Sequence, residues 1–160
     1  MESDAGDTSR RRNETDEERY DRNWVEILQE LRVTQTGTQI ISGFLLTLAF
    51  QQRFQDLDAY QVTVYVVLVL LAAVSTSLGL TPVALHRGLF RQHEKQKIVI
   101  IGNRLLKTTL AVVSVLTAGV VLFVLDVVVG RAAGVIAGAA TFVFLGIMLA
   151  LMPRLVASSR

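Results

Sequence analysis

Hydrophobic and polar positions alternate along this chain in long blocks. Four stretches contain no Asp, Glu, Lys or Arg; they lie between Arg32 and Arg53, Asp58 and His86, Lys107 and Asp126, and Arg131 and Arg154. A membrane-crossing helix needs roughly 20 predominantly apolar residues, whereas a helix of a water-soluble domain carries charge on its outer face. The pattern therefore predicts an all-α polytopic membrane protein with four spans, at about 33–50, 60–80, 105–129 and 132–152.

A shorter amphipathic pattern precedes the first span. Trp24, Ile27 and Leu31 recur at helical spacing and share one face. Asn23 followed three residues later by Glu26 is typical of a capping box. We therefore predict an N-terminal interfacial amphipathic helix that begins at Asn23 and is anchored by Trp24.

Charged segments flank this membrane domain, predicted at 22–154. Residues 1–21 are rich in acids and arginines and nearly lack apolar side chains, which predicts a disordered cytoplasmic tail. Residues 155–160 form a short C-terminal tail. Because proline disfavours helical geometry in the residue before it, Thr81–Pro82 is predicted to end the second span and Pro153 the fourth.

The distribution of basic residues predicts the orientation in the membrane. Apart from Arg53 and Arg131, the 16 Lys and Arg residues lie in the N-terminal segment, between the second and third spans, or near the C-terminus. By the positive-inside rule, both termini and the central loop face the cytoplasm, across a cytoplasmic (inner) membrane. The two hairpins then have parallel orientations, unlike the inverted repeats of many secondary transporters.

Polar residues extend into two of the spans from the cytoplasmic side. They are Arg32, Gln35, Thr36, Gln39 and Ser42 in the first, and Asn103, Arg104 and Lys107 in the third. Because polar side chains at membrane depth favour the bundle interior, one interpretation is a cytoplasm-facing vestibule that binds an anion or an anionic lipid head group. The alternative is that the uncharged groups form hydrogen bonds between helices while the cations extend to the membrane surface.

Two further clusters concern packing. Glu26 and Glu30 are expected to form ion pairs with the basic segment that follows the second span, at Arg87, Arg91, Arg104 or Lys107, and so to hold the N-terminal helix against the bundle. Small residues recur in the fourth span, at Gly130, Gly134, Gly138 and Gly146. Such spacing lets helix backbones approach closely, either within the chain or in a homo-oligomer.

The remaining residues predict no catalytic centre. The chain has no cysteine, which excludes disulfides and thiolate chemistry. His86 and His93 lack the further ligands of a metal site, and no phosphate-binding glycine loop or nucleophile elbow occurs. Asp126 is expected to cap a helix or lie at the membrane interface. Because no nucleophile–base pair can be drawn from these residues, we expect no enzyme and no cofactor, and the net charge of only +2 does not indicate a nucleic-acid partner.

One segment carries a family resemblance. The run Asn23–Leu46, together with Phe50–Phe54 and the His86-Arg87-Gly88 sequence, resembles an uncharacterised family of small four-helix bacterial membrane proteins. The resemblance covers about Asn23 to Met152, and some members of that family are labelled sodium:proton antiporter. It implies membrane location and four spans.

Two functional hypotheses follow. The first is a non-enzymatic binding or assembly subunit, with the lipid bilayer, anionic lipid head groups and further copies of the chain as partners. The second is a small ion or proton-coupled transporter. Proton exchange normally uses carboxylates deep in the membrane, and the interiors of the predicted spans contain none.

Overall fold

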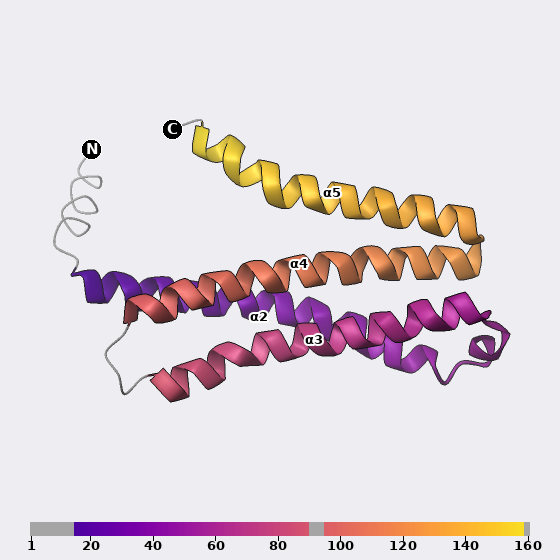
Figure 1. Ribbon diagram of the computed structural model, residues 1–160, viewed down its shortest axis with the longest axis horizontal. Coiled ribbons are helices and arrows are strands. Elements are labelled where there is room, and N and C mark those ends of the chain that lie inside the picture. Colours follow the sequence, from indigo (N-terminus) through magenta and orange to yellow (C-terminus); the bar gives the residue numbers. More distant parts are fainter. Residues whose placement is uncertain (1–14, 90–94, 159–160) are drawn as a thin grey trace, which may run out of the picture.

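The described part of the chain, residues 15–89 and 95–158 of a computed structural model, is helical and contains no strand. Its elements are α2 (Asp16–Leu48), the short 3-10 helix η1 (Gln52–Asp56), α3 (Ala59–Leu89), α4 (Lys95–Val128) and α5 (Arg131–Ser158). The four long helices run up and down along a common direction (Figure 1). The all-α prediction is confirmed.

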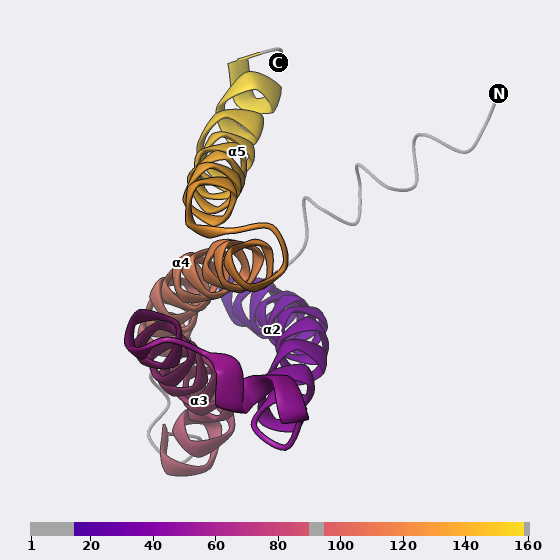
Figure 2. The same ribbon diagram turned by 90° about the vertical axis from the view of Figure 1, so that its right-hand side faces the viewer.

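The helices are arranged as a three-helix bundle with a fourth helix beside it. α2, α3 and α4 pack against one another in all three pairings, whereas α5 packs mainly against α4. Viewed along the bundle, α5 stands on the outer side of α4 (Figure 2). α5 also diverges from α4 toward its C-terminal end (Figure 1), so the two helices are closest near the turn that joins them.

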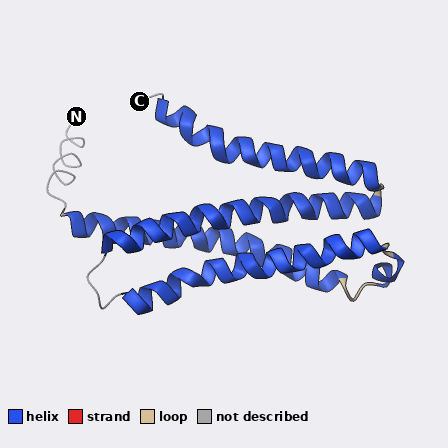
Figure 3. Cartoon of the chain, viewed as in Figure 1, coloured by secondary structure: helices blue, strands red, loops and turns tan. Residues whose placement is uncertain are grey.

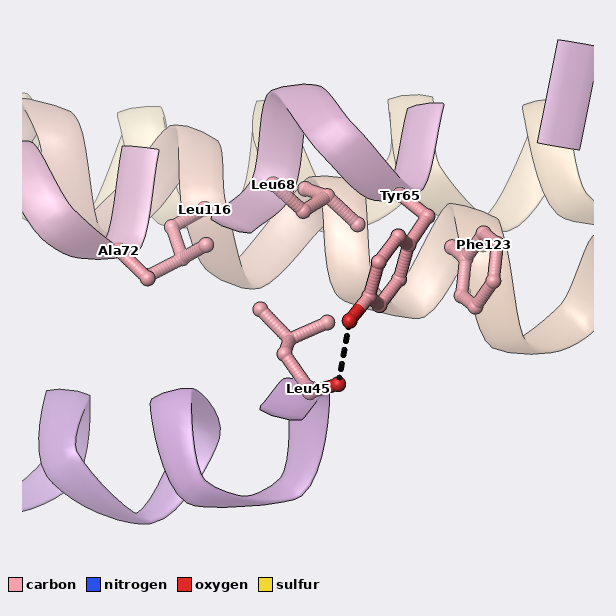
Figure 4. Close-up of a cluster of buried hydrophobic side chains, with 6 residues drawn as sticks. All are labelled: Leu45, Tyr65, Leu68, Ala72, Leu116 and Phe123. Atoms are coloured by element: carbon pink, nitrogen blue, oxygen red, sulfur yellow. Dashed lines mark hydrogen bonds between the residues drawn. The ribbon is translucent and has the colours of Figure 1, made fainter. Parts of the chain in front are cut away.

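The core of the bundle lies where α2, α3 and α4 meet. Its buried cluster comprises Leu45, Tyr65, Leu68, Ala72, Leu116 and Phe123 (Figure 4). The Tyr65 hydroxyl donates a hydrogen bond of 3.0 Å to the Leu45 carbonyl in the last turn of α2, which joins α2 to α3. The Phe54 ring packs edge-on against Tyr65, with 4.9 Å between centroids, and so covers this end of the core.

Three helices in the described part of the chain are long and apolar enough to cross a membrane. The segments are Ala59–Pro82, Val99–Val128 and Arg131–Leu151, and they correspond to the second, third and fourth predicted spans. The first predicted span, 33–50, is not among them, because Gln, Thr and Ser are interspersed with its apolar residues. That α2 crosses the membrane therefore stays a prediction.

The N-terminal helix begins earlier than predicted. α2 starts at Asp16 with Thr15 as its N-cap: the Glu18 N–H donates to the Thr15 hydroxyl, and the Thr15 N–H donates to the Glu18 carboxylate. The capping box predicted at Asn23 is wrong, because this Thr-x-x-Glu box lies upstream and starts the helix first. The predicted interfacial helix and first span form one continuous helix, and residues 16–21, predicted as disordered tail, are its first turns.

Neither proline ends its helix. α3 continues through Pro82 to Leu89, and α5 continues past Pro153 to Ser158, so residues 155–158 are helical, while the candidate spans themselves end at Pro82 and Leu151. Proline is tolerated in membrane helices where neighbouring groups satisfy the freed carbonyls. Pro82 is itself fully buried in the bundle, so its ring fills core space.

Figure 3 shows how little of the described chain lies outside helices: the turn around η1 and the tight turn before α5. The second turn depends on Gly130, whose φ of 132° is unfavourable for residues with a side chain. Together these turns place the ends of α3, α4 and α5 side by side.

Candidate functional site

Five residues form an ion cluster at the end of the bundle where these turns lie: Asp58, Tyr60 and Gln61 at the start of α3, Asp126 near the end of α4, and Arg131 at the start of α5. The Arg131 guanidinium is central to it. Its Nη2 lies 2.6 Å from Asp58 Oδ2, its Nε lies 3.2 Å from Asp126 Oδ2, and its Cζ lies 3.8 Å from the centre of the Tyr60 ring. One side chain thus ties three helices together.

Asp58 combines this ion pair with a helix cap. Its Oδ1 accepts a 2.8 Å hydrogen bond from the Gln61 N–H, and the Gln61 side chain accepts one from the Asp58 N–H. These two bonds form a capping box at the start of α3. The bond from the Gln61 backbone, and secondarily the positive charge of Arg131, hold the pKa of Asp58 below its usual value.

Asp126 is the buried member of the cluster. Its side chain is 3% exposed, against 47% for that of Arg131. Oδ1 accepts long hydrogen bonds of 3.4 Å from the Gln61 amide and from Arg131 Nε. Oδ2 is close to Arg131 but has no partner in hydrogen-bond geometry among the described residues. A buried carboxylate with one incompletely satisfied oxygen depends strongly on its remaining partner.

A second feature, which we call the α2 polar stripe, consists of Arg32, Thr36, Gln39, Gly43 and Thr47. All five are exposed. The buried residues of α2 include Ile27, Leu31, Thr38 and Leu45, and at about 3.6 residues per turn they lie on the opposite side of the helix. The stripe therefore points away from the three-helix core.

The eight residues of the predicted vestibule are dispersed in the described structure. Arg32, Thr36, Gln39, Asn103, Arg104 and Lys107 are exposed, whereas Gln35 and Ser42 are half-buried. The Gln35 amide donates a 3.1 Å hydrogen bond to the Thr76 carbonyl of α3, as expected for interhelical bonding. The Ser42 hydroxyl instead donates to Thr38 of its own helix, which is the pattern of most Ser and Thr residues here.

The predicted ion pairs of the N-terminal helix are only partly covered by the described residues. Glu26 lies 3.9 Å from Arg22 of its own helix, and Glu30 forms no ion pair with a described residue. The side chain of Arg87 and the whole of Arg91 lie outside the described part, as do the side chains of both histidines. Among the side chains that the structure describes, no three of His, Asp or Glu are grouped as a metal ion would require.

The glycines of the fourth span have different roles. Gly134 and Gly138 lie against α4: a Cβ on Gly134 would be 2.6 Å from the Leu122 carbonyl oxygen and 2.8 Å from the Asp126 nitrogen. These two glycines pack within the chain. Gly146 has nothing within 4 Å, so it supports no helix contact within the chain.

A groove runs between α2 and α4 on the outer surface of the bundle. It has a volume of about 430 Å³ and is lined by Gln29, Glu30, Val33, Thr34, Leu106 and Leu110. A second groove, of about 340 Å³, lies between α2 and α3, and its lining includes Ser42, Leu45 and Thr76 but no charged residue. We refer to them as the α2–α4 groove and the α2–α3 groove.

These observations define the class of protein: an all-α helical bundle in which three helices are able to cross a membrane. Residues 13–153 match the Family of unknown function (DUF6328), and the chain belongs to this family. No curated protein and no solved structure matches the chain. Membership agrees with the resemblance of the Asn23–Leu46 segment and assigns no activity.

Sequence reasoning missed the ion cluster. A signal was present, because the predicted topology puts both short loops, and hence Asp58, Asp126 and Arg131, on one side of the membrane. The spacing of Asp58 and Gln61 also fits a capping box. The sequence pattern does not show that Arg131 contacts both Asp58 and Asp126.

Proposed function

We propose that this chain is a four-span protein of the cytoplasmic (inner) membrane, with both termini in the cytoplasm, and that it acts as a non-enzymatic binding or assembly subunit. The packing of α2 against both α3 and α4 supports a fourth span, since two crossing helices would carry the third with them. At about 1.5 Å per residue, α4 between Lys107 and Asp126 is about 28 Å long, close to the roughly 30 Å of a bilayer's hydrocarbon core.

The observation that carries the assembly role is the α2 polar stripe. In a bilayer the side of α2 opposite the core would face lipid, where polar groups are unfavourable. The Thr36 and Thr47 hydroxyls donate to their own helix, but the Gln39 amide makes no hydrogen bond with a described residue. A glutamine offers both donors and acceptors, so a polar helix from another subunit would satisfy it.

Cross-linking through a single thiol tests this role, because the chain has no cysteine of its own. Gln39→Cys places a thiol in the middle of the stripe. Phe142→Cys, at an exposed apolar position of α5, is the matched control. Both variants are expressed in membranes, oxidised, and separately treated with a thiol-reactive photo-cross-linker.

We expect Gln39→Cys to form a disulfide-linked dimer or one defined photo-adduct, and Phe142→Cys to form neither. A second copy of the chain would yield the disulfide-linked dimer, and a different subunit would yield the photo-adduct. If position 39 reacts no more than position 142, and the wild-type protein is monomeric, the assembly role is wrong.

A second candidate, coupled ion or proton transport, is favoured by one observation: Asp126 is buried and lies within the candidate span Val99–Val128. A transporter would show solute-dependent proton flux in liposomes. Asp126→Asn would abolish that flux, and Glu26→Gln, at an exposed position outside the candidate spans, would leave it unchanged. Flux that is absent from the wild-type protein would exclude this candidate.

A further inference from the structure

The α2–α4 groove is amphipathic along its length. Val33, Leu106 and Leu110 supply apolar surface, and Gln29 and Glu30 supply polar groups at one end. If α2 crosses the membrane as proposed, the polar end lies near the cytoplasmic surface, and the apolar part lies at the depth of lipid acyl chains. A ligand that fits this gradient has a polar head and a hydrocarbon tail.

The α4 side of the groove adds a positive charge. Asn103 and Lys107 precede the groove residues Leu106 and Leu110 by three positions each, and residues three apart are neighbours on a helix surface. Both are exposed. The edge of the groove on α4 therefore presents an amide and an ammonium group.

Glu30 and Lys107 lie at the same level of the bundle. Trp24 of α2 packs on Gly102 of α4, and Ile27 and Leu31 form a buried cluster with Leu106. These contacts align the two parallel helices, so residue 30 of α2 is level with residues 106–108 of α4. The groove thus has a carboxylate on one edge and an ammonium group on the other.

Neither charge is neutralised within the described structure. Glu30 and Lys107 form no ion pair with any described residue. A simple anion would be attracted by Lys107 and repelled by Glu30, and a simple cation would experience the reverse. Complementarity to both requires a zwitterion.

We infer that the α2–α4 groove binds a phospholipid whose head group carries a phosphate and a primary amine. The phosphate accepts hydrogen bonds from Lys107 and Asn103, the amine donates to Glu30, and one acyl chain covers Val33, Leu106 and Leu110. This inference rests on the proposed membrane crossing of α2. The α2–α3 groove, which has no charged lining residue, would hold an acyl chain without selecting a head group.

Lipid retention tests the inference. The full-length protein is reconstituted in vesicles of equal parts phosphatidylethanolamine, phosphatidylcholine and phosphatidylglycerol with matched acyl chains, extracted in mild detergent, and its bound lipids are quantified by mass spectrometry. Phosphatidylcholine has the same phosphate but no N–H donor, and phosphatidylglycerol has no amine. The ethanolamine and choline head groups are both positively charged, so only the N–H hydrogen bond to Glu30 distinguishes them; such a bond contributes about 1 kcal/mol, and we expect about fivefold enrichment of phosphatidylethanolamine over phosphatidylcholine.

Three variants separate the contributions. Glu30→Gln should return the ratio of ethanolamine to choline lipid to about one, whereas Glu26→Gln, which makes the same charge change one turn earlier, should leave it at the wild-type value. Lys107→Met should reduce retention of all three lipids and preserve the ratio. Each variant must elute as the wild-type protein does on size exclusion.

Equal retention of the three lipids by the wild-type protein would overturn the inference. So would a preference for phosphatidylglycerol that Glu30→Gln does not change, because the basic residues alone would then select the lipid. Equal effects of Glu26→Gln and Glu30→Gln would also overturn it, since net charge would explain both. Extraction of the protein from membranes by alkaline carbonate would instead contradict the proposed function itself.

Discussion

Adding one methyl group at Gly134 should separate α5 from α4. A Cβ at this position would meet two backbone atoms of α4, the Leu122 oxygen at 2.6 Å and the Asp126 nitrogen at 2.8 Å. Backbone atoms cannot rotate away as the end of a flexible side chain can, so the helices must move apart. Gly146→Ala is the matched control, because nothing lies within 4 Å of Gly146.

The two substitutions should have opposite signs. Overpacking costs about 1–3 kcal/mol, and rigid backbone contacts place Gly134→Ala at the upper end. Each Gly→Ala change in a helix interior recovers about 1 kcal/mol. We therefore expect Gly134→Ala to destabilise the protein by about 2 kcal/mol and Gly146→Ala to stabilise it by about 1 kcal/mol.

Thermal unfolding in detergent measures this difference. For a chain of this size, 1 kcal/mol corresponds to about 2–4 °C in Tm, so the two variants should differ by about 6–12 °C. Far-ultraviolet circular dichroism and the loss of the monodisperse size-exclusion peak after heating provide independent readouts. If Gly134→Ala melts at or above the temperature of Gly146→Ala, the close α4–α5 contact does not exist in solution.

Three further predictions concern the ion cluster and the α2–α4 contact. Arg131→Gln removes the main partner of the buried Asp126 carboxylate and should destabilise the protein by about 1–3 kcal/mol in the same melting experiment. Combining Arg131→Gln with Asp126→Asn should recover part of this loss. If the double variant recovers nothing, the pairing of Arg131 with Asp126 is contradicted. A backbone hydrogen bond lowers the pKa of Asp58 from its ordinary value of 3.8, so its stabilisation is complete above that pH and is lost as the pH falls through the lowered pKa; Tm should drop below about pH 4, and less so in Asp58→Asn. Trp24, the one tryptophan of the chain, packs 2.8 Å from a Cβ position at Gly102, so Gly102→Val should shift its fluorescence emission to longer wavelength, and an unchanged spectrum would contradict this packing.

The boundaries of the helices show where sequence patterns are informative. The break between the third and fourth predicted spans, at residues 130–131, agrees with the turn at Gly130, because the loss of a continuous apolar run marks a local break in the chain. The helix start at Asn23 was wrong, and the helix continues past Pro82, although the second candidate span does end there. An Asn-x-x-Glu sequence is compatible with a helix start, and a proline with a helix end, but neither requires it. The residues before Asn23 and after Pro82 are themselves helical.

The candidate sites show a different limit. Polar residues of α2 were expected to face a shared vestibule, and Gln35 does contact α3. Arg32, Thr36 and Gln39 instead lie on the outer face. Helical periodicity reports which residues share a face, but two polar faces of one helix cannot be assigned to the inside or the outside without knowing where the neighbouring helices pack.

The sequence by itself determined the helical class and the three apolar segments that are able to cross a membrane, because length, hydropathy and the spacing of charges are properties of contiguous residues. Only the tertiary structure decided that Arg131 joins Asp58 to Asp126, that Gly134 but not Gly146 supports helix contact, and that the α2 polar stripe points away from the core. Each of these depends on the distance between residues of different helices, which arises only when the helices pack.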